Sequence, residues 1–251
     1  MRILKYIFLV MCIVPLTLMF LRMDEYQKEE NTYNEIKRIV AEQRIRDGQK
    51  ALPEWINPND LIDFSGLLDK NRETVGYIRI DGTKIDYPVV RTEKDSDRYL
   101  NTGFNGDKSI YGTIFEDSAG GLNLTNNILH GHNMKNGSMF GSLKKFDDEK
   151  YTESYKLIKY ITENTVYLYE TVCFFTASGR NSKLLKNLVP YSKEEFEALK
   201  DTITANKGIF YGDMEWGEQY ITLATCEYSH KSGQCYVIGR LMDKYKFKET
   251  D

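Results

Sequence analysis

Cysteine and histidine are scarce in this sequence, which has four cysteines and three histidines among 251 residues. Cys12 lies in an apolar N-terminal run, so Cys173, Cys226 and Cys235 remain in the rest of the chain. An odd number of cysteines cannot all pair with one another, and at least one thiol must stay reduced. The pattern therefore excludes a domain held together mainly by disulfides.

The chain also lacks an excess of charge of either sign. Lys and Arg number 34, Asp and Glu number 37, and the formal net charge is −3. No basic excess points to nucleic acid or to an anionic lipid surface as a partner. There are no internal repeats or low-complexity tracts. The roughly 200 residues that follow the N-terminal segments suit one domain with a sizeable core.

One long apolar run is present, from Ile3 to Leu21. Its nineteen residues are enough to cross a bilayer as a helix. Arg2 and Lys5 lie at the start of the run, and Asp24 and Glu25 follow it after Arg22, which favours a cytoplasmic N-terminus and an extracellular remainder. A cleaved signal peptide is the alternative, but the following residues offer no small-x-small cleavage site. We therefore expect residues 1–23 to form an uncleaved, single-pass membrane anchor.

The next segment is rich in charge and has apolar residues at helical spacing. The spacings of three, four and seven between these residues predict an amphipathic helix ending near Gly48, and the residues are Tyr26, Tyr33, Ile36, Ile39, Val40 and Ile45. The stretch LPEWINPNDLIDF then predicts a turn leading into a short helix. We interpret residues 24–60 as a helical stalk that packs one stripe on the domain, with a partner-binding coil as the alternative.

The remaining residues, 61–251, have the pattern of a mainly β domain. VGYIRI and TKIDYPVV flank an Asp-Gly turn and predict a hairpin, and six further β-rich runs follow. Two helices are expected among them, one near Ser138–Phe146 and one starting at Ser192 with Glu195 completing a capping box. About eight strands with few helices indicate a closed barrel or a sandwich.

Cys226 is the most informative cysteine. It ends the alternating run ITLATC and precedes the polar loop EYSHKSG, so its thiol is expected at the accessible tip of a strand. His130 and His132 also lie where a strand gives way to a loop, and alternation places both on one face. An imidazole can stabilise a thiolate and later protonate a leaving amine. The alternatives are a buried structural cysteine and solvated loop histidines.

The same residues allow two other interpretations. Cys226, His230 and Cys235, together with the two upstream histidines, could bind zinc, but their spacing is not that of a zinc knuckle. A Cys226–Cys235 disulfide across the hairpin is the other possibility. We favour a reactive thiol and expect no metal and no cofactor.

The motifs resemble those of a known family. TLATC resembles the TLxTC signature of sortases, the membrane-anchored cysteine transpeptidases of Gram-positive bacteria, and LHGHN followed by MF resembles their strand-end histidine motif. The resemblance covers roughly Leu61 to Met242. The N-terminal helices and the helix beginning at Ser192 resemble class B. The matching segments, in chain order, are IRIDGTKIDYPVV, RYLNTGF, YGTIFED, HGHNMKNGSMFGSLKKF and ITLATCEYS.

The resemblance implies a sortase-type, eight-stranded β-barrel with N-terminal helices and a helix inserted before the cysteine strand. Its cysteine would cleave the C-terminal sorting signal of a surface protein or pilin after Thr, and a cell-wall or pilin amine would resolve the thioester. It further implies Cys226 as nucleophile and His132 as acid/base. The residues implied for the substrate groove are Ala224, Thr225, Glu227 and Asn101.

One position departs from the family. Sortases place an arginine at the start of the last strand, and matching YVIGRL to that strand puts Gln234 in its slot. Arg240 has the same strand parity but lies six residues, or about 20 Å, further on. Lys231 could reach from the loop, although an ammonium lacks the bidentate fork of arginine. This departure keeps two alternatives open: a degenerate sortase fold that binds sorting signals with little turnover, and a plain cysteine hydrolase.

Overall fold

The structure is a computed structural model that describes residues 2–42, 52–92, 95–177, 188–227 and 233–248. Its elements are α1 (Arg2–Glu42), η1 (Pro58–Asp60), α2 (Ser65–Lys70), β1 (Thr74–Arg79), β2 (Asp86–Val90), η2 (Ser96–Leu100), β3 (Ile114–Glu116), β4 (Asn126–His130), η3 (Leu143–Asp147), α3 (Glu149–Tyr155), β5 (Leu157–Ile161), β6 (Thr165–Ala177), α5 (Lys193–Ala205), β7 (Ile209–Phe210), β8 (Tyr220–Glu227) and β9 (Gly233–Lys246).

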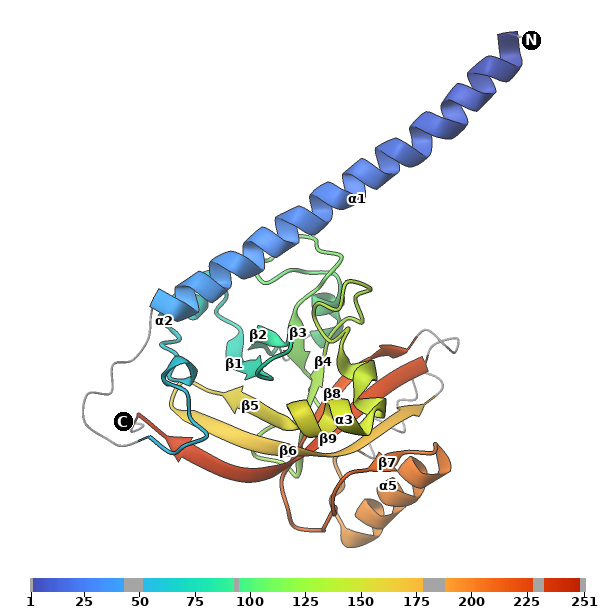
Figure 1. Cartoon of the computed structure of the whole chain (residues 1–251). Helices are drawn as coiled ribbons and strands as arrows, with labels where there is room; N and C mark the ends of the chain where they lie inside the picture. Colours follow the sequence, from blue (N-terminus) through green and yellow to red (C-terminus); the bar gives the residue numbers. More distant parts are fainter. Residues whose placement is uncertain (1, 43–51, 93–94, 178–187, 228–232, 249–251) are drawn as a thin grey trace.

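Eight of the strands form a closed barrel (Figure 1). The order is β5-β1-β2-β3-β4-β8-β9-β6, and β6 pairs again with β5 to close the ring. Strand β7 is a two-residue addition to β6. The pairs β2–β3 and β4–β8 are parallel, and the other pairs in the ring are antiparallel. The eight predicted strands are confirmed, and the barrel rather than the sandwich is the architecture.

The predicted hairpin is the start of the barrel. Strands β1 and β2 pair antiparallel, and the Asp81–Gly82 turn lies between them. Gly82 has a φ of 78°, a left-handed conformation that glycine adopts without steric cost. The Asp-Gly signal therefore identified the hairpin turn.

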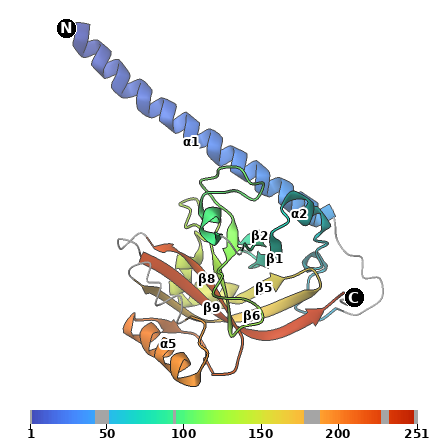
Figure 2. The ribbon, with the colours of Figure 1, turned by 180° about the vertical axis from the view of Figure 1, so that it is seen from behind.

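Helix α1 is one continuous helix that projects from the barrel (Figures 1 and 2). Near its C-terminal end Tyr33, Ile36 and Val40 are buried in the main core, which confirms this part of the predicted stripe. Further toward the N-terminus, the large apolar side chains from Met11 to Met23 are 49–69% exposed. The sequence predicts a membrane-spanning helix here, but among the described residues no helix is long and apolar enough to cross a membrane.

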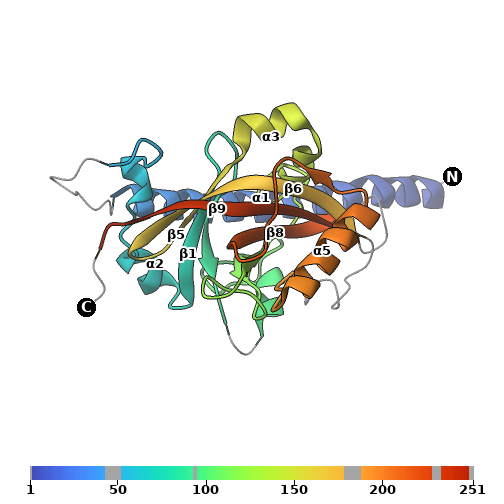
Figure 3. The ribbon, with the colours of Figure 1, turned by 90° about the horizontal axis from the view of Figure 1, so that it is seen from below.

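Helix α5 lies outside the barrel, beside β8 and β9 (Figure 3). The Ser192 side chain accepts a hydrogen bond from the backbone N–H of Glu195, which confirms the predicted cap. Phe196, Leu199 and Ile203 are buried, as their spacing predicts. They belong to a second apolar cluster that includes side chains from one face of β4, β8 and β9, namely Ile128, Ala224, Tyr236 and Ile238.

The helix predicted for Ser138–Phe146 is wrong. The structure has only the 3-10 helix η3 there, from Leu143 to Asp147. Gly137 and Met139 have φ values of 78° and 52°, and a left-handed residue cannot continue a right-handed helix. The amide N–H of Met139 instead donates to the Tyr87 hydroxyl at 3.0 Å, which holds the loop against the barrel.

Candidate active site

Three adjacent strands, β4, β8 and β9, bring the predicted site residues together. Along β8, Ala224 lies opposite His130 of β4 on one side and Tyr236 of β9 on the other. Two residues further on, Cys226 lies opposite Gln234. Since alternate residues of a strand share a face, the backbone positions of Cys226 and Gln234 belong to the same sheet face as Ala224 and His130. The side chain of Cys226 lies outside the described part of the structure.

His132 lies just beyond the end of β4, on the side toward Cys226. The amide of Gly131 donates to the Ala224 carbonyl at 3.1 Å and extends the parallel pairing by one bond. A Cβ atom at Gly131 would lie 2.4 Å from the Ile114 side chain and 2.8 Å from the Phe140 ring, so any larger residue would force these side chains to move. This close packing is the physical reason for a glycine directly before the histidine.

The His132 ring is held by a contact with the end of η2. Its Nε2 atom lies 2.6 Å from the carbonyl oxygen of Leu100, the last residue of η2. Its own carbonyl accepts a hydrogen bond from the amide of Phe140 at 2.9 Å. The contact with Leu100 fixes the orientation of the ring, and its partial exposure gives it access to solvent.

His130 has a different environment. Its Nε2 atom lies 2.8 Å from the Asp117 carboxylate, and its ring stacks on Phe115 with centroids 5.2 Å apart. The residue is only 8% exposed. The acidic partner was missed in the sequence, although Asp117 ends the predicted strand YGTIFED and is close to the facing strand in the barrel.

Gln234 is buried beside the cysteine position. Its side-chain oxygen accepts a hydrogen bond from the Tyr236 hydroxyl, which directs the amide oxygen toward Tyr236. The next residue, Cys235, lies opposite Thr225 and therefore on the other sheet face. Arg240 lies opposite Tyr220, six residues before Cys226, and its guanidinium is 3.8 Å from Glu218.

The predicted groove residues differ in exposure. Ala224 is fully buried and Thr225 is nearly so, whereas Asn101 is exposed and follows the residue that contacts His132. The side chain of Glu227 and all of His230 and Lys231 lie outside the described residues. Within the described part of the chain, no three His, Cys, Asp or Glu side chains gather as a metal site would require.

Comparisons with known proteins point to one family. No protein-family model matches the chain. Sortase B of Listeria monocytogenes is 29% identical over 225 residues, which are 86% of this chain and 87% of that protein. The structure of Clostridium perfringens sortase B is 30% identical and superimposes with a TM-score of 0.63, covering 71% of this chain and 98% of that one.

A second solved structure, a Staphylococcus aureus sortase B–substrate complex, has the same fold. It is 21% identical and superimposes with a TM-score of 0.70, over 87% of this chain and 98% of that one. The chain therefore belongs to the sortase family. Within that family it is a class B-like sortase, since these relatives are all sortase B proteins.

Proposed function

We propose that the protein is a cysteine transpeptidase that cleaves a C-terminal sorting signal after Thr and transfers the new carboxyl end to an amine. The observation that carries this proposal is that the C-terminal ends of β4 and β8 lie side by side in the sheet. The parallel β4–β8 pairing brings the oriented His132 toward the backbone position of Cys226. A thiol beside an imidazole is the pair that covalent acyl transfer needs.

The chemistry divides between these two residues. The Cys226 thiolate attacks the Thr carbonyl carbon, the carbonyl electrons move to oxygen, and the amide C–N bond then breaks. His132 gives its proton to the leaving amine. In the second half, His132 takes a proton from the incoming amine, which attacks the thioester and releases the Cys226 thiolate. Gln234 is the proposed donor near the oxyanion, where a neutral amide gives weaker stabilisation than a charged group.

The substrates would be surface proteins or pilins that carry a sorting signal, and the acceptor would be a cell-wall precursor or a pilin amine. Asn101, Ala224, Thr225 and Glu227 are proposed to line the groove, without metal or cofactor. We place the catalytic barrel, residues 61–251, outside the cell, beyond the stalk of residues 24–60.

We further propose that residues 1–23 attach the protein to the membrane. The exposed apolar side chains from Met11 to Met23 support this placement, because such a surface is unfavourable in water. Recovery of the full chain in the soluble fraction after cell lysis would contradict it.

The first test is a panel of sorting-signal peptides incubated with the protein and followed by mass spectrometry of the intact chain. A thioester adduct on Cys226 is expected. Cys173 should not react, because burial raises the pKa of its thiol to about 12. Peptide binding without an adduct would favour the degenerate binding domain, which Gln234 makes the second candidate. An adduct that yields the same product with and without added amine would favour a plain hydrolase.

Replacing Gln234 by arginine should raise turnover. The guanidinium would add charge to the hydrogen bond that the neutral amide can offer, and one such donor at an oxyanion is worth about 10²–10³ in rate. The measurement is kcat for peptide cleavage by Gln234→Arg, with Arg240→Gln as a control that changes charge six residues away. An unchanged or lower kcat in Gln234→Arg would assign the third role to another residue, with Lys231 the next candidate.

A further inference from the structure

We propose that the Leu100 carbonyl selects the tautomer of His132, so that Nδ1 is the ring nitrogen that exchanges protons with substrate and nucleophile. A carbonyl oxygen can only accept a hydrogen bond. The 2.6 Å contact with Nε2 therefore requires the proton to reside on Nε2. In a neutral imidazole the other nitrogen, Nδ1, is then the base. The catalytic part of this inference rests on the proposed function of His132.

The Leu100 carbonyl is fixed by a close backbone approach. Gly112 has a φ of 60°, and a Cβ atom there would lie 2.4 Å from the Tyr99 oxygen and 2.9 Å from the Leu100 oxygen. The next residue, Thr113, donates its amide N–H to the Tyr99 oxygen at 2.9 Å. Gly112 is therefore required both by its backbone conformation and by the space it leaves to these two carbonyls.

The same short segment is held from its other side. The Tyr99 hydroxyl is hydrogen-bonded to Asn71 at 3.1 Å and to Glu73, and Arg98 forms an ion pair with Glu73. Burial would raise the pKa of Glu73, but the bonds from Tyr99 and the charge of Arg98 lower it overall, so this carboxylate remains ionised at neutral pH. Side chains therefore hold η2 where its last carbonyl reaches His132.

Helix α1 also contributes to this arrangement. The buried hydroxyl of Tyr33 donates to the Gly112 carbonyl at 2.9 Å. Through Gly112 and Leu100, a side chain of the N-terminal helix thus acts on a histidine almost a hundred residues away. Leu100, Gly112 and Tyr33 are positioning residues in this proposal, since they act through His132.

The test is histidine-selective ¹⁵N NMR on the full chain, whose three histidines give few signals. The expected result for the unmodified protein is a His132 ring protonated at Nε2 when neutral. Gly112→Ala should displace the Leu100 carbonyl, give a mixture of tautomers and slow Cys226 alkylation by iodoacetamide about ten-fold at pH 7, because less thiolate is stabilised. Gly217→Ala is the matched control: its φ of 96° imposes similar strain, but its Cβ would meet nothing within 4 Å.

Three outcomes would overturn the proposal: a His132 ring protonated at Nδ1 in the unmodified protein, an unchanged tautomer in Gly112→Ala, or equal slowing of alkylation in Gly217→Ala. If Gly112→Ala does not fold, Tyr33→Phe replaces it, because it removes the bond to the Gly112 carbonyl without adding an atom. A smaller shift in the same direction is then expected, and an unchanged tautomer would count against the proposal. Full peptide cleavage by His132→Ala would instead refute the proposed function and leave the tautomer assignment intact.

Discussion

The Cys226→Ala and His132→Ala variants are expected to lose cleavage of sorting-signal peptides, each by about 10⁴-fold or more. Without Cys226 no thioester can form. Without His132 the leaving amine has no proton donor and the thiolate has no cationic partner. The measurement is single-turnover cleavage of a fluorogenic peptide at neutral pH. Because the two residues act as a unit, the double variant should be no slower than either single variant.

His130→Gln is the matched control for His132→Ala. It removes a histidine two residues earlier, at the end of β4, but one whose ring is hydrogen-bonded to Asp117 rather than to Leu100. Glutamine can still donate a hydrogen bond to Asp117, so cleavage should stay within about ten-fold of the original rate. Retained cleavage by Cys226→Ala would end the transpeptidase proposal. A loss in His130→Gln as large as in His132→Ala would contradict the assignment of the acid/base role to His132.

The fold could be predicted from the sequence where a local pattern fixes the backbone. Alternation in runs such as NNILH and ITLATC, together with the Asp81–Gly82 turn, was enough to place the strands. The Ser192 cap and the apolar spacing after it were enough to place α5. These signals come from residues that are close in the sequence. The long-range contacts of the closed barrel favour the same strands and helix, so the local prediction holds.

The failures occur where distant backbone contacts decide the conformation. Ser138–Phe146 has the composition of a helix, but the Tyr87 hydroxyl and the left-handed Met139 hold it as a loop. The contact between His132 and Leu100 also has no local signal, because the carbonyl of any residue could supply it. Only the closure of the barrel shows which segment passes by the histidine.

The register of β8 and β9 shows the same limit. The sequence match assigns Gln234 to the arginine slot, but it cannot test this register, because a one-residue slip would exchange the two faces. The structure pairs Gln234 with Cys226 and directs Cys235 to the other face. Likewise, the stretch LPEWINPNDLIDF predicts only a turn leading into a short helix, and nothing in it indicates that Asp60 is the most deeply buried carboxylate of the described N-terminal segments.

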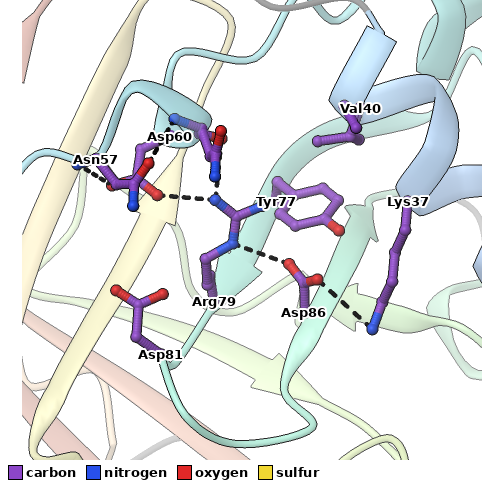
Figure 4. Close-up of a pocket in the computed structure, with 10 residues that line it drawn as sticks. Lys37, Val40, Asn57, Asp60, Tyr77, Arg79, Asp81 and Asp86 are labelled. Atoms are coloured by element: carbon purple, nitrogen blue, oxygen red, sulfur yellow. Dashed lines mark hydrogen bonds and ion pairs between the residues drawn. The ribbon is translucent and has the colours of Figure 1, made fainter.

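The largest loss of stability is expected from Asp60→Ala. Asp60 lies in a pocket of about 280 Å³ between α1 and the β1–β2 hairpin (Figure 4) and is fully buried. Its carboxylate accepts hydrogen bonds from Arg79 at 2.8 Å, Lys159 at 2.7 Å and the amide of Asn57 at 2.9 Å. Without this carboxylate, the largely buried side chains of Arg79 and Lys159 each lose a negatively charged partner. Such a loss typically lowers the free energy of unfolding by about 3–5 kcal/mol. Urea unfolding of the variant measures this loss.

Asp81→Ala is the matched control for this effect, because Asp81 is bonded to the same Lys159 at 2.9 Å but is 63% exposed. An exposed partner of this kind is worth less than about 1 kcal/mol, since water can replace it. Adding Lys159→Met to Asp60→Ala should restore part of the lost stability, because one of the unpaired charges is then gone. Equal losses in Asp60→Ala and Asp81→Ala, or no recovery in the double variant, would show that packing rather than buried charge explains the role of Asp60.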